Sequence, residues 1–467
     1  MSAGLVLRNV EIDGRGGLDL RIEDGGIAEI GPGLGGGGES LDGRGGALIP
    51  GLADHHIHLL ALAAQADSVD LSEARGPDEV AARIAEAAGA RPPGAWIRAI
   101  GYHEQIAGDL FRHDLDRLAP AHRLRVQHQT GSLWMLNSRA IEALGGGDYP
   151  ACVERDGAGR PTGRIWRGDA WLRSRIGAQA PPLAPIGRRL AAQGVTHLTD
   201  ASVTTDAVAA GLLAQAHRRG ELPQRLTLMS GGPLTAPKDG AFTVGPFKVL
   251  LDDHALPELD DFIARIALAR ELGRPVAVHC VTAGELAMTL AAFESAGAAV
   301  GDRIEHGGLI PAAAFDQIKA MGLAVVTQPA FVLERGDRYL AEVPAGEQVD
   351  LYRCASLIEA GVPVAASSDA PYASTDPWRG IEAAVHRRTA SGQPIGPGEA
   401  IPASAALALY LDAPTAPGRV RRRVTVGEAA DLCLLDAPLG RVLAEPGAER
   451  VAATIIGGEA AYLRGGA

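Results

Sequence analysis

Residues 47–60 read ALIPGLADHHIHLL, a short apolar run followed by one carboxylate and three histidines. Side chains two positions apart on a β-strand point to the same side, so Asp54, His56 and His58 share one face and His55 lies on the other. Two imidazoles spaced as HxH on one strand can bind a single cation. The stretch therefore predicts a buried strand that ends in a metal-binding pair.

Seven further segments repeat the short apolar or β-branched run, and segments rich in Ala, Leu, Glu and Arg that suit helices lie between them. The eight runs cover residues 47–58, 194–202, 224–232, 245–253, 274–282, 302–308, 322–331 and 361–371. Helices are expected at 258–273, 283–297, 311–322 and 349–361, each ending at a glycine. This repetition predicts an α/β fold, a (β/α)8 TIM barrel with its functional groups at the carboxyl ends of the strands.

Both ends of the chain alternate apolar and polar residues in short bursts between glycine-rich turns, a pattern of strands without helices. We expect residues 1–48 and 418–467 to form one small β-sandwich domain, with the barrel in 49–417. Residues 61–193 separate the first two barrel strands, which is far more than one crossover helix needs. This stretch is therefore predicted to contain an inserted subdomain over the active site, with a helix in 76–90.

The composition is that of an ordinary globular protein: 467 residues, 46% hydrophobic and 21% charged. A net charge of −12 repels nucleic acid and anionic membrane surfaces. The four cysteines form no CxxC pair, the amino terminus lacks a signal-peptide pattern, and no apolar run approaches the ~20 residues of a membrane span. We expect a cytoplasmic protein that acts on a small molecule and has no nucleic-acid or membrane partner. The sequence leaves open whether the protein forms a homo-oligomer.

Other metal-binding residue types lie near the ends of later predicted strands, namely Lys248, His279, His306 and Asp369. Each one alone could be structural, because a strand histidine is usually a hydrogen-bonded core residue and a strand-end aspartate usually caps a turn or helix. Together with the HxH pair, these residues come from five predicted strands in a fixed order. Structural roles for all five are harder to accept. The set indicates a metal centre at the mouth of the barrel.

With these residues in place, the chain resembles the amidohydrolase superfamily, whose pattern is HxH on strand 1, Lys on strand 4, His on strands 5 and 6, and Asp on strand 8. The segments PGLADHHIH, GVTHLTDA and VGEAADLCLLD, and Asn137-Ser138 in the insertion, resemble amidohydrolase family 3, which includes N-substituted formamide deformylase. The chain departs from that branch at Gly131-Ser132, where relatives have Gly-His, and after Lys248, where they have Asp-Gly. Both departures lie where substrate contacts are expected.

The resemblance implies two divalent metal ions, with zinc as the first expectation. His56, His58 and Asp369 would bind the more buried ion, and His279 and His306 the more exposed one. A lysine ammonium carries only donors and would repel a dication, so Lys248 is expected to carry a CO₂-derived carbamate that bridges both ions. A metal-bridging hydroxide would attack the substrate carbonyl, with Asp369 as the catalytic proton acceptor and donor.

Substrate contacts are expected from the insertion and from one late strand end, although aromatic residues of an inserted subdomain more often build its own core. The candidates are Tyr102, His103, His128, Trp134, Asn137, Trp166 and Gln328. Asp54 is expected either to orient the HxH pair or to have a structural role. His197 and Asp200 are expected near the mouth, without an assigned role.

The predicted reaction is hydrolysis of a C–N bond in an amide, N-acyl or N-formyl compound. One alternative is a mononuclear metal-dependent deaminase of the same superfamily, against which Lys248 argues. A second alternative is a non-catalytic homologue that keeps the barrel as a scaffold, because fold does not dictate function.

Overall fold

The computed structural model describes residues 4–35, 38–145, 149–176 and 181–465. The chain forms two compact units, Met1–Leu59 with Leu183–Ala467 and Leu60–Pro182. Among the described residues, no helix is both long and apolar enough to span a membrane.

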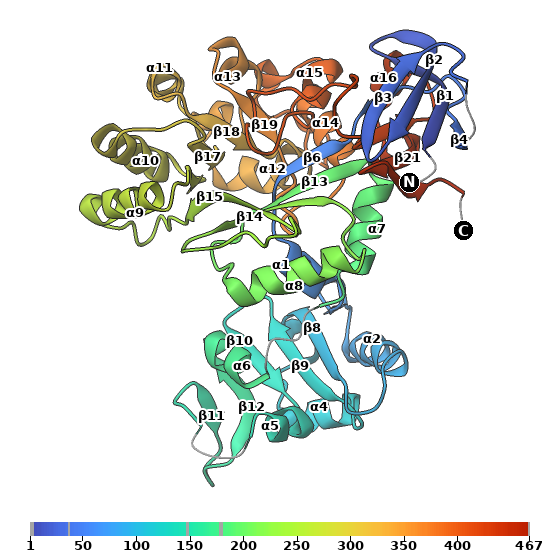
Figure 1. The fold of residues 1–467 in the computed structure, drawn as a ribbon. Coiled ribbons are helices and arrows are strands. Elements are labelled where there is room, and N and C mark those ends of the chain that lie inside the picture. Colours follow the sequence, from blue (N-terminus) through green and yellow to red (C-terminus); the bar gives the residue numbers. More distant parts are fainter. Residues whose placement is uncertain (1–3, 36–37, 146–148, 177–180, 466–467) are drawn as a thin grey trace. The chain divides into compact units, whose positions relative to one another are not determined.

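The first unit contains one parallel sheet of eight strands, one for each apolar run in the sequence (Figure 1). The strands are β6 (Leu52–Ile57), β13 (Val195–Asp200), β14 (Arg225–Ser230), β15 (Thr243–Val249), β16 (Val276–Cys280), β17 (Arg303–His306), β18 (Ala324–Thr327) and β19 (Val364–Ala366). They are paired in chain order from β6 to β19. The two ends meet where the Asp369 amide donates to the His56 carbonyl at 2.8 Å and the His58 amide to the Ala370 carbonyl at 2.9 Å. The predicted barrel is confirmed.

Helices flank the strands of the barrel, except between β14 and β15, where the described residues 231–242 form no helix. They are α7 (Ala184–Ala192), α8 (Ala207–Arg218), α9 (Leu259–Glu271), α10 (Ala283–Ala296), α11 (Phe315–Ala320), α12 (Ala330–Glu342), α13 (Ala355–Glu359), α14 (Pro377–His386) and α15 (Ala403–Ala408). The helix predicted over 349–361 is wrong in its first half. The Glu399 carboxylate accepts hydrogen bonds from the Cys354 amide at 3.0 Å and the Ser356 amide at 3.1 Å, so the helix begins only at Ala355.

The two chain ends together form a β-sandwich of two four-stranded sheets, as predicted. One sheet has β1 (Leu5–Ile12), β2 (Arg15–Glu23), β3 (Gly26–Gly31) and β4 (Glu39–Asp42), and the other has β5 (Leu48–Pro50), β20 (Leu432–Leu435), β21 (Val451–Ile456) and β22 (Glu459–Leu463). Their shared core joins Leu7 and Leu20 to Leu432 and Ile455. The expectation that these ends lack helices is wrong at α16 (Leu439–Ala444), which begins directly after Pro438.

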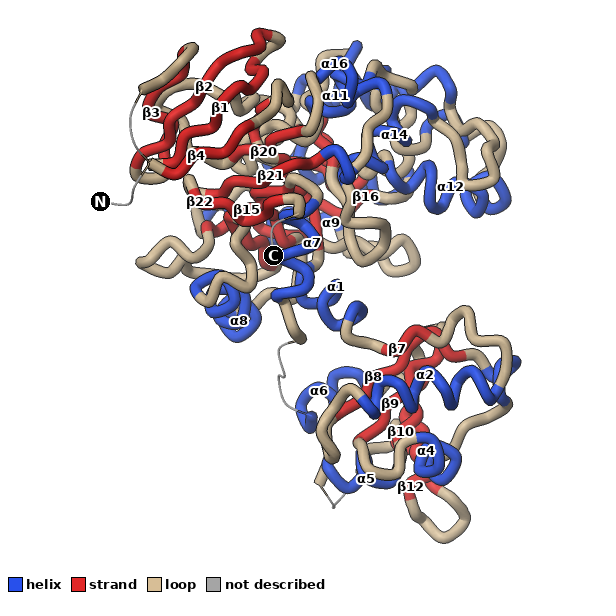
Figure 2. Tube along the Cα trace, turned by 90° about the vertical axis from the view of Figure 1, so that its right-hand side faces the viewer, coloured by secondary structure: helices blue, strands red, loops and turns tan. Residues whose placement is uncertain are grey.

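The second unit has a six-stranded sheet of its own (Figure 2). Its strands are β7 (Val69–Asp70), β8 (Trp96–Tyr102), β9 (Arg123–His128), β10 (Leu133–Leu136), β11 (Val153–Arg155) and β12 (Pro161–Trp166), and its helices are α1 (Leu59–Ala66), α2 (Pro77–Gly89), α3 (Glu104–Ala107), α4 (Arg112–Leu118), α5 (Ser138–Ala143) and α6 (Asp169–Ile176). Two apolar clusters, one around Ile97 and Val126 and the other around Trp134 and Ile165, form its core. The large insertion after the first barrel strand is confirmed; its place over the active site stays a prediction.

Candidate metal centre

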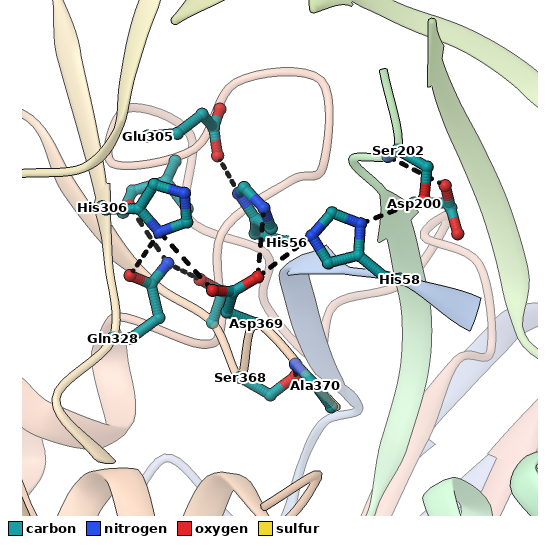
Figure 3. Close-up of polar contacts among 12 residues, drawn as sticks. His56, His58, Asp200, Ser202, Glu305, His306, Gln328, Ser368, Asp369 and Ala370 are labelled. Carbon is teal, nitrogen blue, oxygen red and sulfur yellow. Dashed lines mark hydrogen bonds and ion pairs between the residues drawn. The ribbon is translucent and has the colours of Figure 1, made fainter. Parts of the chain in front are cut away.

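The carboxylate of Asp369 is the point at which three predicted ligands meet at the carboxyl ends of the strands (Figure 3). Its Oδ1 lies 3.1 Å from Nε2 of His58 and 3.4 Å from Nε2 of His56, and its Oδ2 lies 3.7 Å from Nδ1 of His306. His56, His306 and Asp369 can each offer one ligand atom to the same ion, because these atoms lie within 4.8 Å of one another. The fold therefore gathers residues from β6, β17 and the segment after β19.

The backbone at the strand ends turns sharply to present two of these side chains. His306 and Asp369 both have a left-handed backbone, with φ values of 68° and 53°. Non-glycine residues adopt this region rarely, and such residues often cluster at functional sites. Asp54 holds the turn after β19 in place, since it accepts hydrogen bonds from the Ser368 amide at 3.0 Å and from the Ser368 hydroxyl. Asp54 thus positions the segment that carries Asp369; its predicted role in orienting the HxH pair stays a prediction.

Three of the four histidines use their Nδ1 atoms for hydrogen bonds to residues other than Asp369, although Nδ1 of His306 also lies 3.7 Å from Asp369 Oδ2. Nδ1 of His56 bonds to the Glu305 carboxylate, Nδ1 of His58 lies 3.0 Å from the Ser202 hydroxyl, and Nδ1 of His306 donates to Gln328 Oε1 at 2.9 Å. A carboxylate or amide oxygen can only accept, so His56 and His306 carry their proton on Nδ1. Nε2 then keeps its lone pair for a metal, which is the usual arrangement of a metal-binding histidine.

The partner of His56 belongs to a buried ion pair that is absent from the residues predicted from the sequence. Arg303 and Glu305 lie on β17 and are 1% and 0% exposed. The Arg303 guanidinium donates to Glu305 through Nε and to the His55 carbonyl through Nη2 at 3.0 Å. Two opposite charges two positions apart on a buried strand were the available signal, because such a strand is otherwise apolar.

Lys248 and His279 complete the predicted set from the neighbouring strands β15 and β16. The His279 ring lies 4.5 Å from the His306 ring, and the His306 ring lies 4.7 Å from the His56 ring, both between centroids. Lys248 is 2% exposed, and its pKa is lowered because burial disfavours the charged ammonium. Burial thus shifts Lys248 toward the neutral amine.

Burial also keeps the imidazoles neutral, which is the state that binds metal. It lowers the pKa values of His56 and His306 well below the ordinary value, and that of His279 to about 4. The pKa of Asp369 is raised, mainly by burial, against the opposing effect of His58 and other nearby cations. Neutral imidazoles do not offset the charge of the desolvated Asp369 carboxylate. A bound cation would offset that charge and accept the lone pairs of the imidazoles.

Three buried polar atoms of the centre have no hydrogen-bond partner in the described part of the chain: Nε2 of His56, Nζ of Lys248 and Oδ1 of Asp369. Native proteins pair nearly all buried polar atoms, because an unpaired one costs about 1–3 kcal/mol. A bound cation would satisfy the histidine and the aspartate, and a lysine converted to an anionic ligand would join them. The residues therefore fit the metal centre that the sequence predicts.

The substrate role predicted for Gln328 is corrected by its contacts. Gln328 is fully buried, with Oε1 accepting from His306 and Nε2 donating to the Ser367 hydroxyl at 2.9 Å. Both ends of its amide are thus committed within the barrel. Gln328 thus orients the ring of His306, and no atom of its amide is left for a substrate.

Three of the predicted substrate residues form the interior of the second unit. Tyr102 is 1% exposed and donates to the Gly108 carbonyl at 2.6 Å, and Asn137 is fully buried and caps α5 by accepting from the Ala140 amide at 2.9 Å. Trp134 is 5% exposed, with Nε1 donating to Asp169 at 2.8 Å. Their polar atoms are already satisfied, so the structure gives them a structural role in place of the predicted substrate contact.

The remaining candidates of the insertion form a second group of possible ligands, His103 with Glu104 and His128. Nδ1 of His103 accepts from the Gln105 amide at 3.1 Å, and Nδ1 of His128 accepts from the Thr130 amide at 3.2 Å. Each neutral ring then carries its proton on Nε2, and His128 uses it to donate to Glu104 at 2.9 Å. The lone pairs are taken, so this group does not suit a metal.

Trp166, the last candidate of the insertion, is 45% exposed and donates from Nε1 to Glu154 at 3.1 Å. It is the one predicted tryptophan with a large free surface. Its contact with a substrate stays a prediction.

Of the two further residues of β13 that were expected near the barrel mouth, Asp200 lies there and His197 does not. His197 lies away from the barrel mouth, with Nε2 3.6 Å from Asp431 and Nδ1 3.3 Å from Arg422, both on the carboxyl-terminal part of the chain. Asp200 accepts from the Leu59 amide at 2.8 Å and from the Ser202 amide at 3.0 Å. Asp200 thus fixes the segment after β6 and the residue that bonds to His58.

Comparisons with known proteins identify the family of this chain and relatives of its fold. The family model described as "Amidohydrolase family" matches residues 39–462. N-substituted formamide deformylase of Arthrobacter pascens is 26% identical, with 85% of each chain covered, and putative amidohydrolase YtcJ of Bacillus subtilis (strain 168) is 25% identical over 91% of this chain and 90% of its own. A metal-dependent hydrolase from Pyrococcus horikoshii OT3 has the same fold, with a TM-score of 0.75 at 21% identity over 93% of this chain and 97% of its own.

Proposed function

This chain belongs to the amidohydrolase family, and from that premise we propose that it is a metal-dependent hydrolase of a C–N bond in a small amide, N-acyl or N-formyl compound. Membership of the family confirms the prediction of a hydrolase. The observation that carries the metal-dependent reaction is the orientation of the His56 and His58 rings. Their Nδ1 atoms bond to Glu305 and Ser202, and their Nε2 atoms face Asp369. The resemblance to a formamide deformylase supports an N-acyl or N-formyl substrate.

Two divalent cations would be held by the predicted set of six side chains. Zinc is the first expectation because histidine-rich sites favour it. Bound there, the cations would polarise a carbonyl group and lower the pKa of water. The ligands would be His56, His58, Lys248, His279, His306 and Asp369.

Lys248 would enter this set as a carbamate. Its neutral amine would form an N–C bond with CO₂ and release one proton, which turns a donor into an anionic ligand with two oxygens. The lowered pKa of Lys248 supports this step, because only the neutral amine has a lone pair for CO₂.

Asp369 would move the proton of the reaction. It would accept a proton from the attacking water and deliver it to the departing nitrogen. Burial raises its pKa, which brings the carboxyl group closer to the range in which a general acid and base can act near neutral pH.

A mononuclear deaminase is the second candidate, and one observation favours it. His56, His306 and Asp369 offer their ligand atoms to one ion, although the hydrolase assignment gives His306 to a second ion. Metal analysis separates the two functions: two ions per chain with a modified Lys248 support the hydrolase, and one ion with an unmodified Lys248 supports the deaminase.

The proposed function is tested by a screen of N-formyl, N-acyl and cyclic amides on protein reconstituted with metal in the presence of bicarbonate. We expect turnover of at least one class and its loss in Asp369→Asn, with the metal content preserved. Asp316→Asn, in the first turn of α11, is the matched control and should keep full activity. An Asp369→Asn variant as active as the parent would contradict the role of Asp369.

A further inference from the structure

Arg335 on α12 is a cation close enough to Asp369 for its charge to oppose the rise in the pKa of that carboxyl group, yet it forms no ion pair with a described carboxylate. Helix α12 begins two residues after Gln328, the partner of His306, and Arg335 lies in its second turn. Its guanidinium packs over the Phe331 ring at 4.6 Å and over the Tyr372 ring at 5.7 Å. The side chain is therefore held in one place by aromatic contacts.

Tyr372 connects this cation to the predicted catalytic residues. It follows Asp369 by three positions, and its amide donates to the Asp369 carbonyl at 2.9 Å. Its ring lies 5.9 Å from the His58 ring in an edge-to-face arrangement, and the residue is 55% exposed. An exposed aromatic ring with a guanidinium beside it thus lies next to His58.

The hydrogen bonds of Arg335 go to a neutral acceptor and do not pair its positive charge with a carboxylate. Nε and Nη2 both donate to the Tyr372 carbonyl, at 3.0 and 2.6 Å. The nearest acidic residue in sequence, Glu334, pairs with Arg379 at 3.1 Å, and Glu342 pairs with Arg338 at 2.8 Å. Among the described residues, Arg335 thus has a neutral acceptor but no ion-pair partner, although its planar fork suits a carboxylate.

We propose that Arg335 binds a carboxylate of the substrate, so that this enzyme prefers amides that carry a carboxylate over neutral amides of the same shape. The inference rests on the proposed function, and it adds the charge of the substrate. Tyr372 forms the apolar wall between the carboxylate and the amide, and Phe331 holds the guanidinium from behind.

Matched pairs of substrates test the inference. Racemic N-formylphenylalanine and N-formyl-2-phenylethylamine differ only in a carboxylate on the amine part. N-(2-phenylethyl)succinamic acid and N-(2-phenylethyl)butanamide differ on the acyl part, where a methyl group replaces the carboxylate. In at least one pair, we expect kcat/KM of the holoenzyme to be tenfold or more higher for the carboxylate. A preference for the neutral compound, or none, in both pairs overturns the inference.

Single substitutions on α12 test whether Arg335 causes the preference for the carboxylate. Arg335→Gln should lower the ratio of kcat/KM values about tenfold or more, as expected for loss of a charge-assisted hydrogen bond, and Arg335→Lys should restore part of it. Arg338→Gln is the control on the same helix, since Arg338 is 70% exposed and pairs only with Glu342; it should keep the ratio of the parent. An unchanged ratio in Arg335→Gln overturns the inference.

Binding separates this inference from the proposed function. Metal-loaded Asp369→Asn is titrated calorimetrically with the two carboxylates, with and without Arg335→Gln. Tighter binding of a carboxylate than of its neutral partner, lost in Arg335→Gln, supports the inference even if none of the four compounds is hydrolysed. In that case the proposed function fails for these compounds and the carboxylate site stands. Equal binding in both proteins overturns the site.

Discussion

The Glu305 carboxylate accepts a hydrogen bond from Nδ1 of His56 inside the barrel, where both side chains are fully buried. The two residues are 249 positions apart and come from β17 and β6. Glu305 in turn pairs with Arg303, so the histidine rests on a buried ion pair. This contact fixes the ring of His56 and makes its Nε2 lone pair a better ligand for a cation.

Replacing Glu305 should therefore weaken metal binding and the fold together. In Glu305→Gln we expect metal affinity to fall about tenfold to a hundredfold. The buried Arg303 would also lose its counter-charge, at a cost of about 3–5 kcal/mol in the free energy of unfolding. Competition with a chelator measures the affinity, and urea unfolding of the metal-free protein measures the stability.

Glu342→Gln is the control for this variant, because Glu342 is 58% exposed and pairs with Arg338 on the surface. It should change both quantities little, as is usual for exposed ion pairs. If Glu305→Gln bound metal as tightly as this control, the orienting role of Glu305 would be wrong.

The hydroxyl of Ser202 should matter less than Glu305, because a bond to a neutral hydroxyl is weaker than one to a carboxylate. Its oxygen lies 3.0 Å from Nδ1 of His58, which is partly exposed. In Ser202→Ala we expect metal affinity to fall by no more than about tenfold, the equivalent of one ordinary hydrogen bond. The same chelator competition checks this order, and a larger loss in Ser202→Ala than in Glu305→Gln would reverse it.

His55 should make the metal-free protein sensitive to acid. It is fully buried, and burial lowers its pKa to about 3, far below the ~6.5 of an unfolded chain. The unfolded state then binds more protons between these values, so stability is present above pH 6.5 and is lost as the pH falls. At pH 5.5 the loss from this residue is about 1.4 kcal/mol relative to pH 8.

Urea unfolding at pH 8 and pH 5.5 measures this effect. His55→Leu should lose less stability than the parent over the same interval, by about that amount, because leucine does not titrate. His279, whose pKa burial lowers to about 4, is present in both proteins and cancels. An equal loss in the two proteins would show that His55 is not buried in its neutral form.

The group around His128 should not contribute to the metal content. Its Nε2 donates to Glu104, and its Nδ1 accepts from the Thr130 amide. We therefore expect His128→Asn to contain as many ions per chain as the parent, as measured by plasma mass spectrometry. A lower count would mean that the second unit binds an ion of its own.

The barrel could be predicted from the sequence because its strands are short apolar runs in a regular order, as in residues 274–282 and 322–331. The ligand set could be proposed because HxH on one strand puts His56 and His58 on the same face. Both arguments need only local spacing. The ends of helices were less predictable from local spacing. The start of α13 depends on a hydrogen bond from the Cys354 amide to Glu399, which lies 45 positions later in the chain.

The partners of the ligands could not be predicted, because they depend on which side chains meet inside the closed barrel. Ser202 and Gln328 reach His58 and His306 from other strands, and their sequence surroundings do not single them out. Tyr102 and Asn137 are polar residues of an insertion, a position that favours a prediction of substrate contact. The structure shows that a subdomain of this size uses such residues for its own core and helix caps.

The central claim is that six side chains of the barrel form one metal centre, and anomalous diffraction from crystals of the metal-reconstituted protein tests it most directly. Data above and below the metal absorption edge locate each ion. The account predicts two peaks, one within ligand distance of His56, His58 and Asp369 and the other beside His279 and His306, with a carbamate of Lys248 between them. A bare Lys248 side chain with no anomalous peak near these histidines would contradict it.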